Sequence, residues 1–195
     1  MPDDAQVTRR PGGRTAHTRE RVLSAVAAIL TEEGFDAVSV DAVAARSRVH
    51  RTTVYRRWRD PGGLLADALD AAREQAWEPP DTGSLRGDLT AVNAQVIEAL
   101  TGRPPVTTAL IAASFRSPAA AHALRAFWED RYARAAVVVT RAIARGDAAP
   151  DADPRAVLVA ATAPLFHELA LMRAPAAPGL AERYAALAAA AALGG

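Results

Sequence analysis

The 195-residue sequence has no cysteine, no lysine and few aromatic residues, which make up 5% of the chain. Without cysteine, disulfides, Cys-ligated metal sites and thiol nucleophiles are excluded. The sequence also lacks an apolar run of roughly 18 residues, the length that a transmembrane helix needs. Positions 1–13 are polar and contain Arg9 and Arg10 instead of the apolar segment of a secretory signal. We therefore expect a soluble cytoplasmic protein.

Catalytic and metal-binding motifs are missing as well. The four histidines, at positions 17, 50, 122 and 167, do not have the close spacing that metal ligands need. The glycine pairs Gly12-Gly13 and Gly62-Gly63 lack the surrounding pattern of a phosphate-binding loop. Glu32-Glu33 is a solvated pair at the end of an expected helix rather than a catalytic dyad. We therefore expect no enzymatic activity, no metal and no cofactor.

Alanine is the residue that the sequence has in excess. It accounts for 49 positions, and it is the strongest helix former. The remaining apolar residues are mainly leucine and valine, enough to build a core, and none of them alternates with polar residues as in a strand. The sequence therefore predicts an all-α fold of about nine helices with close helix–helix contacts.

Apolar spacing and capping residues divide the chain into a flexible arm over residues 1–17 and a series of helices. The helices are expected at 18–33, 40–46, 50–58, 61 to about 77, 84–101, 105–116, 118–145, 154–172 and 179–193. Pro164 should kink the helix over 154–172, because proline lacks a backbone N–H donor. A break at Pro79-Pro80 follows the fourth helix. We predict one domain over 18–64 and a second over 65–195.

The charge is distributed unevenly. All 23 basic residues are arginines, and six of them lie between Ala44 and Arg59, where there is no acidic residue. Residues 61–195 are slightly acidic, with 12 arginines against 14 acids. A basic segment on a slightly acidic body is typical of a small nucleic-acid-binding head. The alternative is a solvated basic helix face without a partner.

Two short helices over 40–46 and 50–58, joined by a tight turn and backed by a longer first helix, form a helix-turn-helix layout. The second short helix has the pattern needed to enter a major groove. Its expected solvent side carries Arg51, Thr52, Arg56 and Arg57. Its expected inner side carries Val49, Val54 and Trp58.

This segment resembles the TetR family of bacterial transcriptional regulators. The matching residues are Gly34-Phe35, Ser39 to Arg46, Val49, Thr53-Val-Tyr-Arg-Arg-Trp58 and Leu64-Leu65. The resemblance in motif covers about residues 18–70, and beyond them it is mainly architectural. Three positions depart from the family pattern. Arg48 replaces the usual turn glycine and adds strain if its φ is positive, His50 replaces the usual serine cap, and Pro61 replaces a frequent lysine.

The resemblance implies which residues contact DNA. Thr53, Tyr55 and the start of the helix at Ser39 would bind phosphates, whereas Arg51, Thr52 and Arg56 would meet base edges. The full set of candidates is Ser39, Arg48, His50, Arg51, Thr52, Thr53, Tyr55, Arg56 and Arg57. The alternative for Tyr55 is a core aromatic. Arg57 and Arg59 would supply only general electrostatic attraction to the DNA backbone. The arm with Arg9, Arg10 and Arg14 either lies in a minor groove or is an idle tail.

For the remaining helices, the resemblance implies an effector pocket and a dimer formed by the last two helices. The candidate pocket residues are Trp77, Asn93, Phe115, Trp128, Arg131 and His167. The candidate dimer residues are Leu158, Leu165, Leu169, Leu180, Tyr184 and Leu187. The alternatives are an ordinary core for the aromatic residues and a monomeric bundle for the leucines. His167 and Glu168 fit either the pocket or the dimer.

Arg131 falls inside the apolar stripe of the helix over 118–145 and therefore needs an anionic partner. That partner is either a carboxylate of the chain, Glu98, Glu129 or Glu168, or an acidic ligand. The alanine-rich surroundings otherwise suggest an apolar effector.

Taken together, these features predict a ligand-responsive homodimeric repressor that binds a near-palindromic operator in double-stranded DNA. One alternative is an activator or an effector-independent regulator with the same fold. The other is a helical small-molecule-binding protein that does not recognise DNA sequence.

Overall fold

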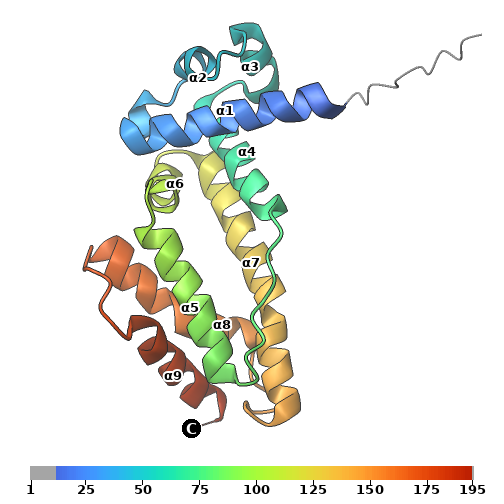
Figure 1. Cartoon of the computed structure of the whole chain (residues 1–195), viewed down its shortest axis with the longest axis vertical. Coiled ribbons are helices and arrows are strands. Elements are labelled where there is room, and N and C mark those ends of the chain that lie inside the picture. The colour runs from blue at the N-terminus through green and yellow to red at the C-terminus, as the bar shows by residue number, and fades with distance from the viewer. Residues whose placement is uncertain (1–11, 195) are drawn as a thin grey trace, which may run out of the picture.

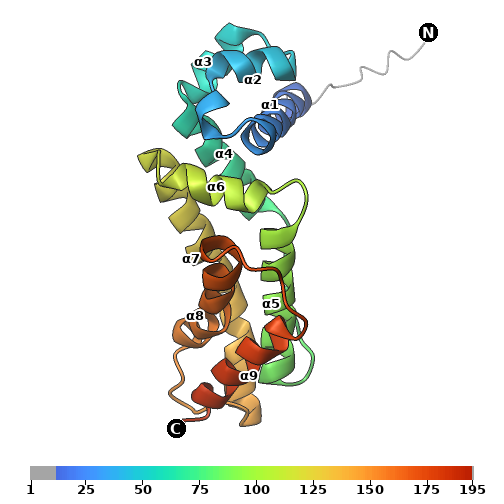
Figure 2. The same cartoon turned by 90° about the vertical axis from the view of Figure 1, so that its left-hand side faces the viewer.

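The computed structural model describes residues 12–194, with side chains from Thr15 onward, and over this range the chain is helical with no strand. An N-terminal head and an elongated body are joined through α4 (Figures 1 and 2). The elements are α1 (Gly12–Glu32), η1 (Phe35–Ala37), α2 (Val40–Ser47), α3 (Arg51–Trp58), α4 (Pro61–Glu74), α5 (Leu85–Thr101), α6 (Val106–Ser114), α7 (Pro118–Arg145), α8 (Pro154–Leu165), η2 (Phe166–Leu171) and α9 (Leu180–Ala192). The predicted all-α fold is confirmed.

Capping residues explain most helix boundaries. The side chains of Ser39, Asp60, Ser84 and Ser117 each accept a hydrogen bond from a backbone N–H in the first turn of the helix that follows. Such a bond satisfies a donor that the helix itself leaves free. At the other end of α7, Gly146 has a φ of 81°, the left-handed conformation that ends a helix at little cost.

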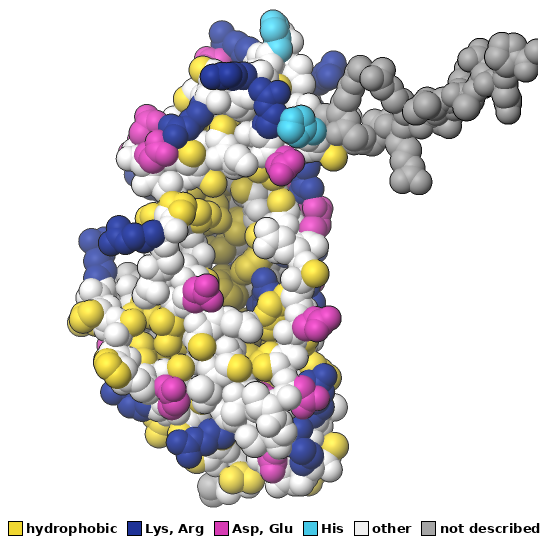
Figure 3. All heavy atoms as spheres, in the orientation of Figure 1, with side chains coloured by type: hydrophobic (Ala, Val, Ile, Leu, Met, Phe, Trp, Pro, Cys, Tyr) yellow, Lys and Arg dark blue, Asp and Glu magenta, His cyan; other side chains and the backbone are white. Residues whose placement is uncertain are grey.

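The body consists of α5, α7, α8 and α9 packed around an apolar core, with α4 lying along α7. The largest residues of this core are Leu85, Leu89 and Leu158, all of which are fully buried. A hollow with hydrophobic walls opens below the head, between α5 and the segment that links α4 to α5 (Figure 3).

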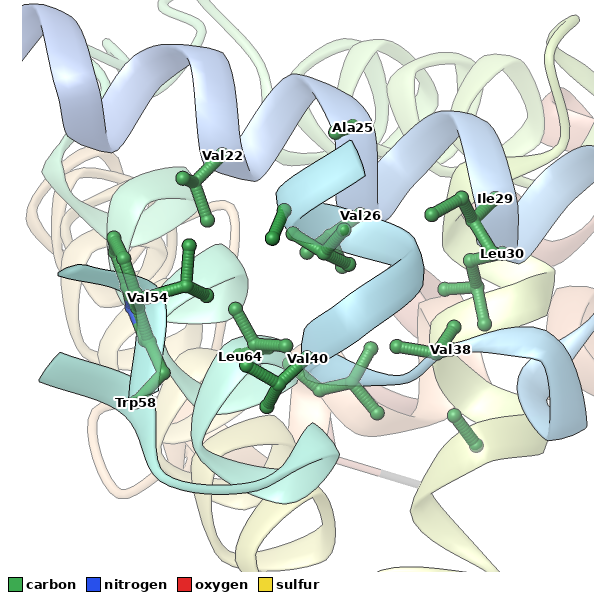
Figure 4. Packing of buried hydrophobic residues seen from close by; sticks show 14 of the residues in the cluster. Val22, Ala25, Val26, Ile29, Leu30, Val38, Val40, Val54, Trp58 and Leu64 are labelled. Carbon is green, nitrogen blue, oxygen red and sulfur yellow. The ribbon is translucent and has the colours of Figure 1, made fainter. Parts of the chain in front are cut away.

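The head has its own core, which Figure 4 shows from close by. Val22 and Val26 of α1 point toward Val54 of α3 and Leu64 of α4, and all four side chains are fully buried. The same cluster extends to Ala113 and Ala120 at the junction of α6 and α7. An ion pair of 2.7 Å between Asp36 and Arg116, in the turn between α6 and α7, also joins the body to the head. The head is therefore packed against the body at the junction of α6 and α7.

The boundaries differ from the predicted ones at several points. The first helix begins at Gly12 instead of residue 18, so only residues 1–11 of the expected arm lie outside the described residues. The fourth helix ends at Glu74, because Gln75 is extended with a ψ of 135°; Ala76 and Trp77 therefore do not continue its stripe. The sixth helix is shorter than predicted.

The expected kink at Pro164 takes the form of a change in helix type. The α-helical hydrogen bonds of α8 end at Leu165, and the chain continues through η2, a π-helical turn. Proline removes one backbone donor from the helix, and a π-turn is one way in which the chain rearranges its remaining bonds. No helix among residues 12–194 is long and apolar enough to cross a membrane.

Candidate nucleic-acid interface and effector cavity

The surface of α3 is divided as its sequence predicts. Val54 and Trp58 face the core with exposed fractions of 0% and 5%. Arg51, Thr52, Arg56 and Arg57 are exposed, as are the flanking Arg48, His50 and Arg59. Tyr55 is 41% exposed, so it is a surface residue and not the core aromatic that was the alternative. The exposed face presents cations and hydroxyl groups, which are the groups that bind phosphates and base edges.

The turn before α3 contains Arg48, whose φ of 53° places a non-glycine residue in the left-handed region. Its backbone N–H donates to the carbonyl groups of Ala44 and Ala45 and so ends α2. The Arg21 guanidinium of α1 donates to the carbonyl groups of Ser47 and Arg48 at 2.5 and 3.1 Å. A cation from α1 thus holds the turn in place, as expected for a positive charge at a helix C-terminus.

Arg51 is engaged within the head. Its guanidinium lies 2.6 Å from a carboxylate oxygen of Asp41 in α2 and 5.2 Å from the ring centre of Tyr55. The side chains of Arg51 and Asp41 are 64% and 54% exposed, so the pair contributes little to stability. A phosphate or a base edge can therefore displace Asp41 at low cost.

The other candidate contacts lie around this helix. The Ser39 hydroxyl accepts a hydrogen bond from the Ala42 N–H and keeps its own proton for donation. His50 starts α3 without a side-chain cap, and its Nδ1 lies 2.9 Å from the Thr52 hydroxyl. Thr53 is half-buried.

Asp67 of α4 connects three helices of the head, a role that the sequence analysis missed. One carboxylate oxygen accepts from the Arg19 guanidinium of α1 at 2.7 Å, and the other accepts from the Trp58 indole N–H of α3 at 2.7 Å. Burial alone would raise the pKa of Asp67, but the hydrogen bonds from Arg19 and Trp58 outweigh it and lower this pKa. The only sequence signal for this role was an acidic residue inside the apolar stripe of α4.

Glycine at position 63 allows α4 to begin directly against the end of α3. A Cβ at Gly63 would lie 2.4 Å from the backbone oxygen of Trp58, which is closer than van der Waals contact allows. The start of α4 and the end of α3 are therefore in tight contact through both Gly63 and Asp67.

The body contains a cavity of about 260 Å³ between α5, α7 and α8. Its walls are mostly aromatic and aliphatic side chains. They comprise Trp77, Val92, Gln95, Val96, Ala99, Phe127, Trp128, Arg131, Tyr132, Ala135, Leu158 and Thr162. Apolar walls with a few polar groups are typical of a small-molecule site.

The C-terminal end of α4 and the segment after it, which carries Trp77, are fixed to α7 by arginines. Arg134 donates to the Arg73 carbonyl at 2.6 Å, and Arg141 donates to the Pro80 carbonyl at 3.2 Å. Two lining residues of the cavity are joined by an exposed hydrogen bond: the Trp77 indole N–H donates to the Gln95 side-chain oxygen at 2.7 Å. One wall of the cavity is thus continuous with the C-terminal end of α4.

Of the six predicted pocket residues, Trp77, Trp128 and Arg131 line this cavity and the other three do not. Asn93 is fully buried and donates to the Ala181 carbonyl of α9 at 3.0 Å, so it joins two helices. Phe115 is 84% exposed at the end of α6. His167 is exposed on η2. The position of a residue beside an apolar stripe did not show whether its side chain faces a cavity, another helix or solvent.

The environment of Arg131 differs from the salt bridge expected for it. Its guanidinium lies 4.7 Å from the ring centre of Trp77 and 5.4 Å from that of Phe127. Within residues 15–194, no carboxylate forms an ion pair with it: Glu129 pairs with Arg155 at 2.8 Å, and Glu168 accepts from Tyr184 at 3.0 Å. Burial, with the nearby Arg134, lowers the pKa of Arg131.

Four of the six predicted dimer residues are buried within the chain itself. Leu158, Leu165, Leu169 and Leu180 are at most 9% exposed, because α5, α7 and α9 cover them. Tyr184 is half-buried against Glu168, whereas Leu187 is 62% exposed. Exposed positions of α8, η2 and α9 recur at helical spacing and include Ala156, Ala160, Ala163, His167, Arg183, Leu187 and Ala190. Figure 2 shows the side of the body that carries these helices.

No group of three or more acidic or histidine residues among the described part of the chain is arranged to hold a metal ion.

Comparisons with known proteins agree with this architecture. The family profile described as "Bacterial regulatory proteins, tetR family" matches residues 22–68, and the one described as "Tetracyclin repressor-like, C-terminal domain" matches residues 79–188. The HTH-type transcriptional regulator AqdR of Rhodococcus erythropolis is 36% identical over 163 residues, which cover 82% of this chain and 77% of that protein. The DNA-binding transcriptional repressor TetR of Mycobacteroides abscessus is 35% identical over 159 residues, which cover 79% of this chain and 83% of that protein.

Among solved structures, the TetR family transcription regulator SCO0332 superposes with a TM-score of 0.67 at 27% identity, covering 89% of this chain and 97% of that one. Regulators of this family bind DNA operators and form dimers, and they are not enzymes. The head, the helical body and both profile matches lead to one conclusion: the chain belongs to the TetR family of bacterial DNA-binding transcriptional regulators.

Proposed function

We propose that this regulator is a homodimeric repressor that releases a near-palindromic operator when a small molecule occupies the cavity of the body. The observation that carries this proposal is the position of the cavity next to the end of α4. The start of α4 is in contact with α3 through Gly63 and Asp67, and the segment after α4 carries Trp77 into the cavity wall. A ligand that displaces this wall would displace α4 and, with it, the DNA-binding helix.

In this proposal the DNA-binding unit is residues 18–64, and residues 65–195 bind the effector and the second subunit. The exposed face of α3 enters the major groove, with Arg51, Thr52 and Arg56 at base edges. The hydroxyl groups of Ser39, Thr53 and Tyr55 bind phosphates. Further contacts to the DNA backbone come from Arg48, His50 and Arg57. The two-fold symmetry of a dimer sets the half-sites about 34–36 Å apart, or a multiple of that distance.

The second subunit is expected on the exposed face of α8, η2 and α9. Ala156, Ala160 and Ala163 are exposed at successive turns of α8, and small side chains allow a partner helix to approach closely. Leu187 supplies a large exposed apolar side chain on α9. Burial of these residues by a second copy would remove the apolar surface from water.

A selection of binding sites from random duplex DNA, with the bound mass measured in parallel, tests the proposal. An enriched inverted repeat bound by one or two dimers supports it. Binding that enriches no motif and disappears near physiological salt would reject it, because non-specific attraction to phosphates has that salt dependence. A reporter placed behind the enriched site then shows repression if its expression rises when the gene is deleted.

A further inference from the structure

The cavity of the body contains one charge without a counter-ion. Arg131 is the only charged side chain among the described residues that line it. The neighbouring acid Asp130 is occupied by Arg134, which forms an ion pair with it and also donates to the Arg73 carbonyl. Arg131 is half-buried, and even partial burial of a cation without an anionic partner has a cost. The site is therefore incomplete as the chain alone builds it.

The ring contacts of Arg131 leave its hydrogen-bond donors available. A guanidinium interacts with an aromatic ring through its face, whereas its N–H groups lie in its plane. Within the described part of the chain, no oxygen accepts a hydrogen bond from the Arg131 side chain, although Trp77 and Phe127 hold it in place. An arginine held in this way is prepared for a bidentate bond to a planar anion such as a carboxylate.

The other walls of the cavity favour a ligand with a flat apolar ring. Phe127 and Trp128 meet edge to face with their ring centres 5.0 Å apart, and Trp128 meets Phe166 in the same way at 5.1 Å. Rings packed in this manner form rigid walls, against which another ring can bind edge to face or offset. Gln95 accepts from Trp77 and keeps its amide N–H groups as a second donor.

From these observations we propose that the effector is a small aromatic acid, whose carboxylate binds Arg131 and whose ring lies among Trp77, Phe127 and Trp128. This inference rests on the proposed function, because it names the chemical class of the molecule that the regulator senses. It replaces the expectation of a purely apolar effector.

Isothermal titration calorimetry of the full chain with matched acids and amides tests the inference. The probes are benzoate and 2-naphthoate, each compared with its neutral carboxamide. We expect at least one acid to bind about tenfold more tightly than its amide, since hydrogen bonds to charged groups contribute that much. Arg131→Gln should abolish this preference, whereas Arg131→Lys, which keeps the charge without the planar fork, should retain part of it.

Arg125→Gln is the matched control, because Arg125 is an exposed arginine of the same helix and does not line the cavity. It should bind like the unmodified protein, and thermal unfolding of each variant shows whether the fold is kept. The inference is overturned if neither acid binds, if acid and amide bind equally, or if folded Arg131→Gln keeps the preference.

Operator binding, measured with the same probes, separates this inference from the proposed function. If an acid binds through Arg131 but the protein keeps its operator, the assignment of the cavity to an aromatic acid stands and ligand-induced release is rejected. If only neutral compounds bind and release the operator, ligand-induced release stands and the aromatic-acid inference is rejected.

Discussion

The head and the body place their arginines in different surroundings. In the head, Arg19, Arg46 and Arg51 each lie 2.6–2.7 Å from a carboxylate oxygen; the Arg19 pair is largely buried, whereas the side chains of the Arg46 and Arg51 pairs are 38–64% exposed. In the body, Arg131 lies against aromatic rings inside a cavity. An exposed ion pair exchanges its acid for a phosphate at little cost, whereas a desolvated cation responds strongly to the one anion that reaches it. The first arrangement suits reversible contact with DNA, and the second suits recognition of a small ligand.

The largest effect is expected at the DNA-binding face of the head. Arg51→Ala should weaken operator binding by about 1–3 kcal/mol and relax the sequence preference at one base pair of each half-site. Tyr55→Phe removes only a hydroxyl group that we propose to contact phosphate, so it should weaken binding to all sequences alike. Binding curves on the operator and on single-base variants measure both effects, and equal relaxation by the two substitutions would refute these roles.

A pair of matched substitutions tests the difference between the two regions directly. Arg19→Gln breaks the bonds to Asp67 and Glu74, so it should lower the free energy of unfolding by about 1–2 kcal/mol. Arg131→Gln removes a cation that has no counter-ion, so without ligand it should leave this free energy unchanged or raise it. Urea unfolding at one fixed protein concentration measures both values. A larger loss at position 131 than at position 19 would contradict the comparison.

The Asp67 carboxylate should make the stability of the head dependent on pH. Its pKa is lowered in the folded state, so its contribution is complete above the unfolded pKa of about 4 and is lost as the pH falls through the lower folded value. Asp67→Asn should therefore cost about 1 kcal/mol at pH 7 and progressively less below pH 4. Unfolding of both proteins across this pH range measures the effect, and a constant difference would show that the ionised carboxylate is not responsible.

The smallest effect is expected for the exposed partner of Arg51. Asp41→Asn should change the free energy of unfolding by no more than about 0.5 kcal/mol, because both side chains are exposed. The same substitution should strengthen operator binding slightly, since it frees Arg51 and removes a negative charge near DNA. Glu32→Gln, at an ion pair on Arg46 away from α3, is the matched control. Weaker operator binding by Asp41→Asn would show that Asp41 orients Arg51 instead of competing for it.

The parts of the fold that depend on local signals could be predicted from the sequence. Ser39, Asp60 and Gly146 fixed helix ends through their own backbone and side-chain geometry, and α7 has the predicted bounds. The inner and outer faces of α3 also followed from helical periodicity. The start of α1 was wrong by six residues, since Gly12-Gly13 predicted a loop whereas the helix begins there.

The parts that depend on distant neighbours could not be predicted. Helical spacing shows that Leu158 and Leu165 need burial, but it does not show whether their own subunit or another covers them. Likewise, the apolar stripe of α7 indicated that Arg131 needs a partner, but Trp77 reaches it from a segment more than 50 positions earlier in the sequence. Such pairings are decided by how α4, α5 and α7 pack together.

The three tryptophans have one more consequence. Trp58 is the last residue of α3 and faces the core of the head, and Trp77 and Trp128 line the cavity. The chain therefore carries a fluorescent side chain at each end of the proposed communication path. Replacing Trp77 and Trp128 with phenylalanine would leave one indole, hydrogen-bonded to Asp67. Its emission would then report on the head alone.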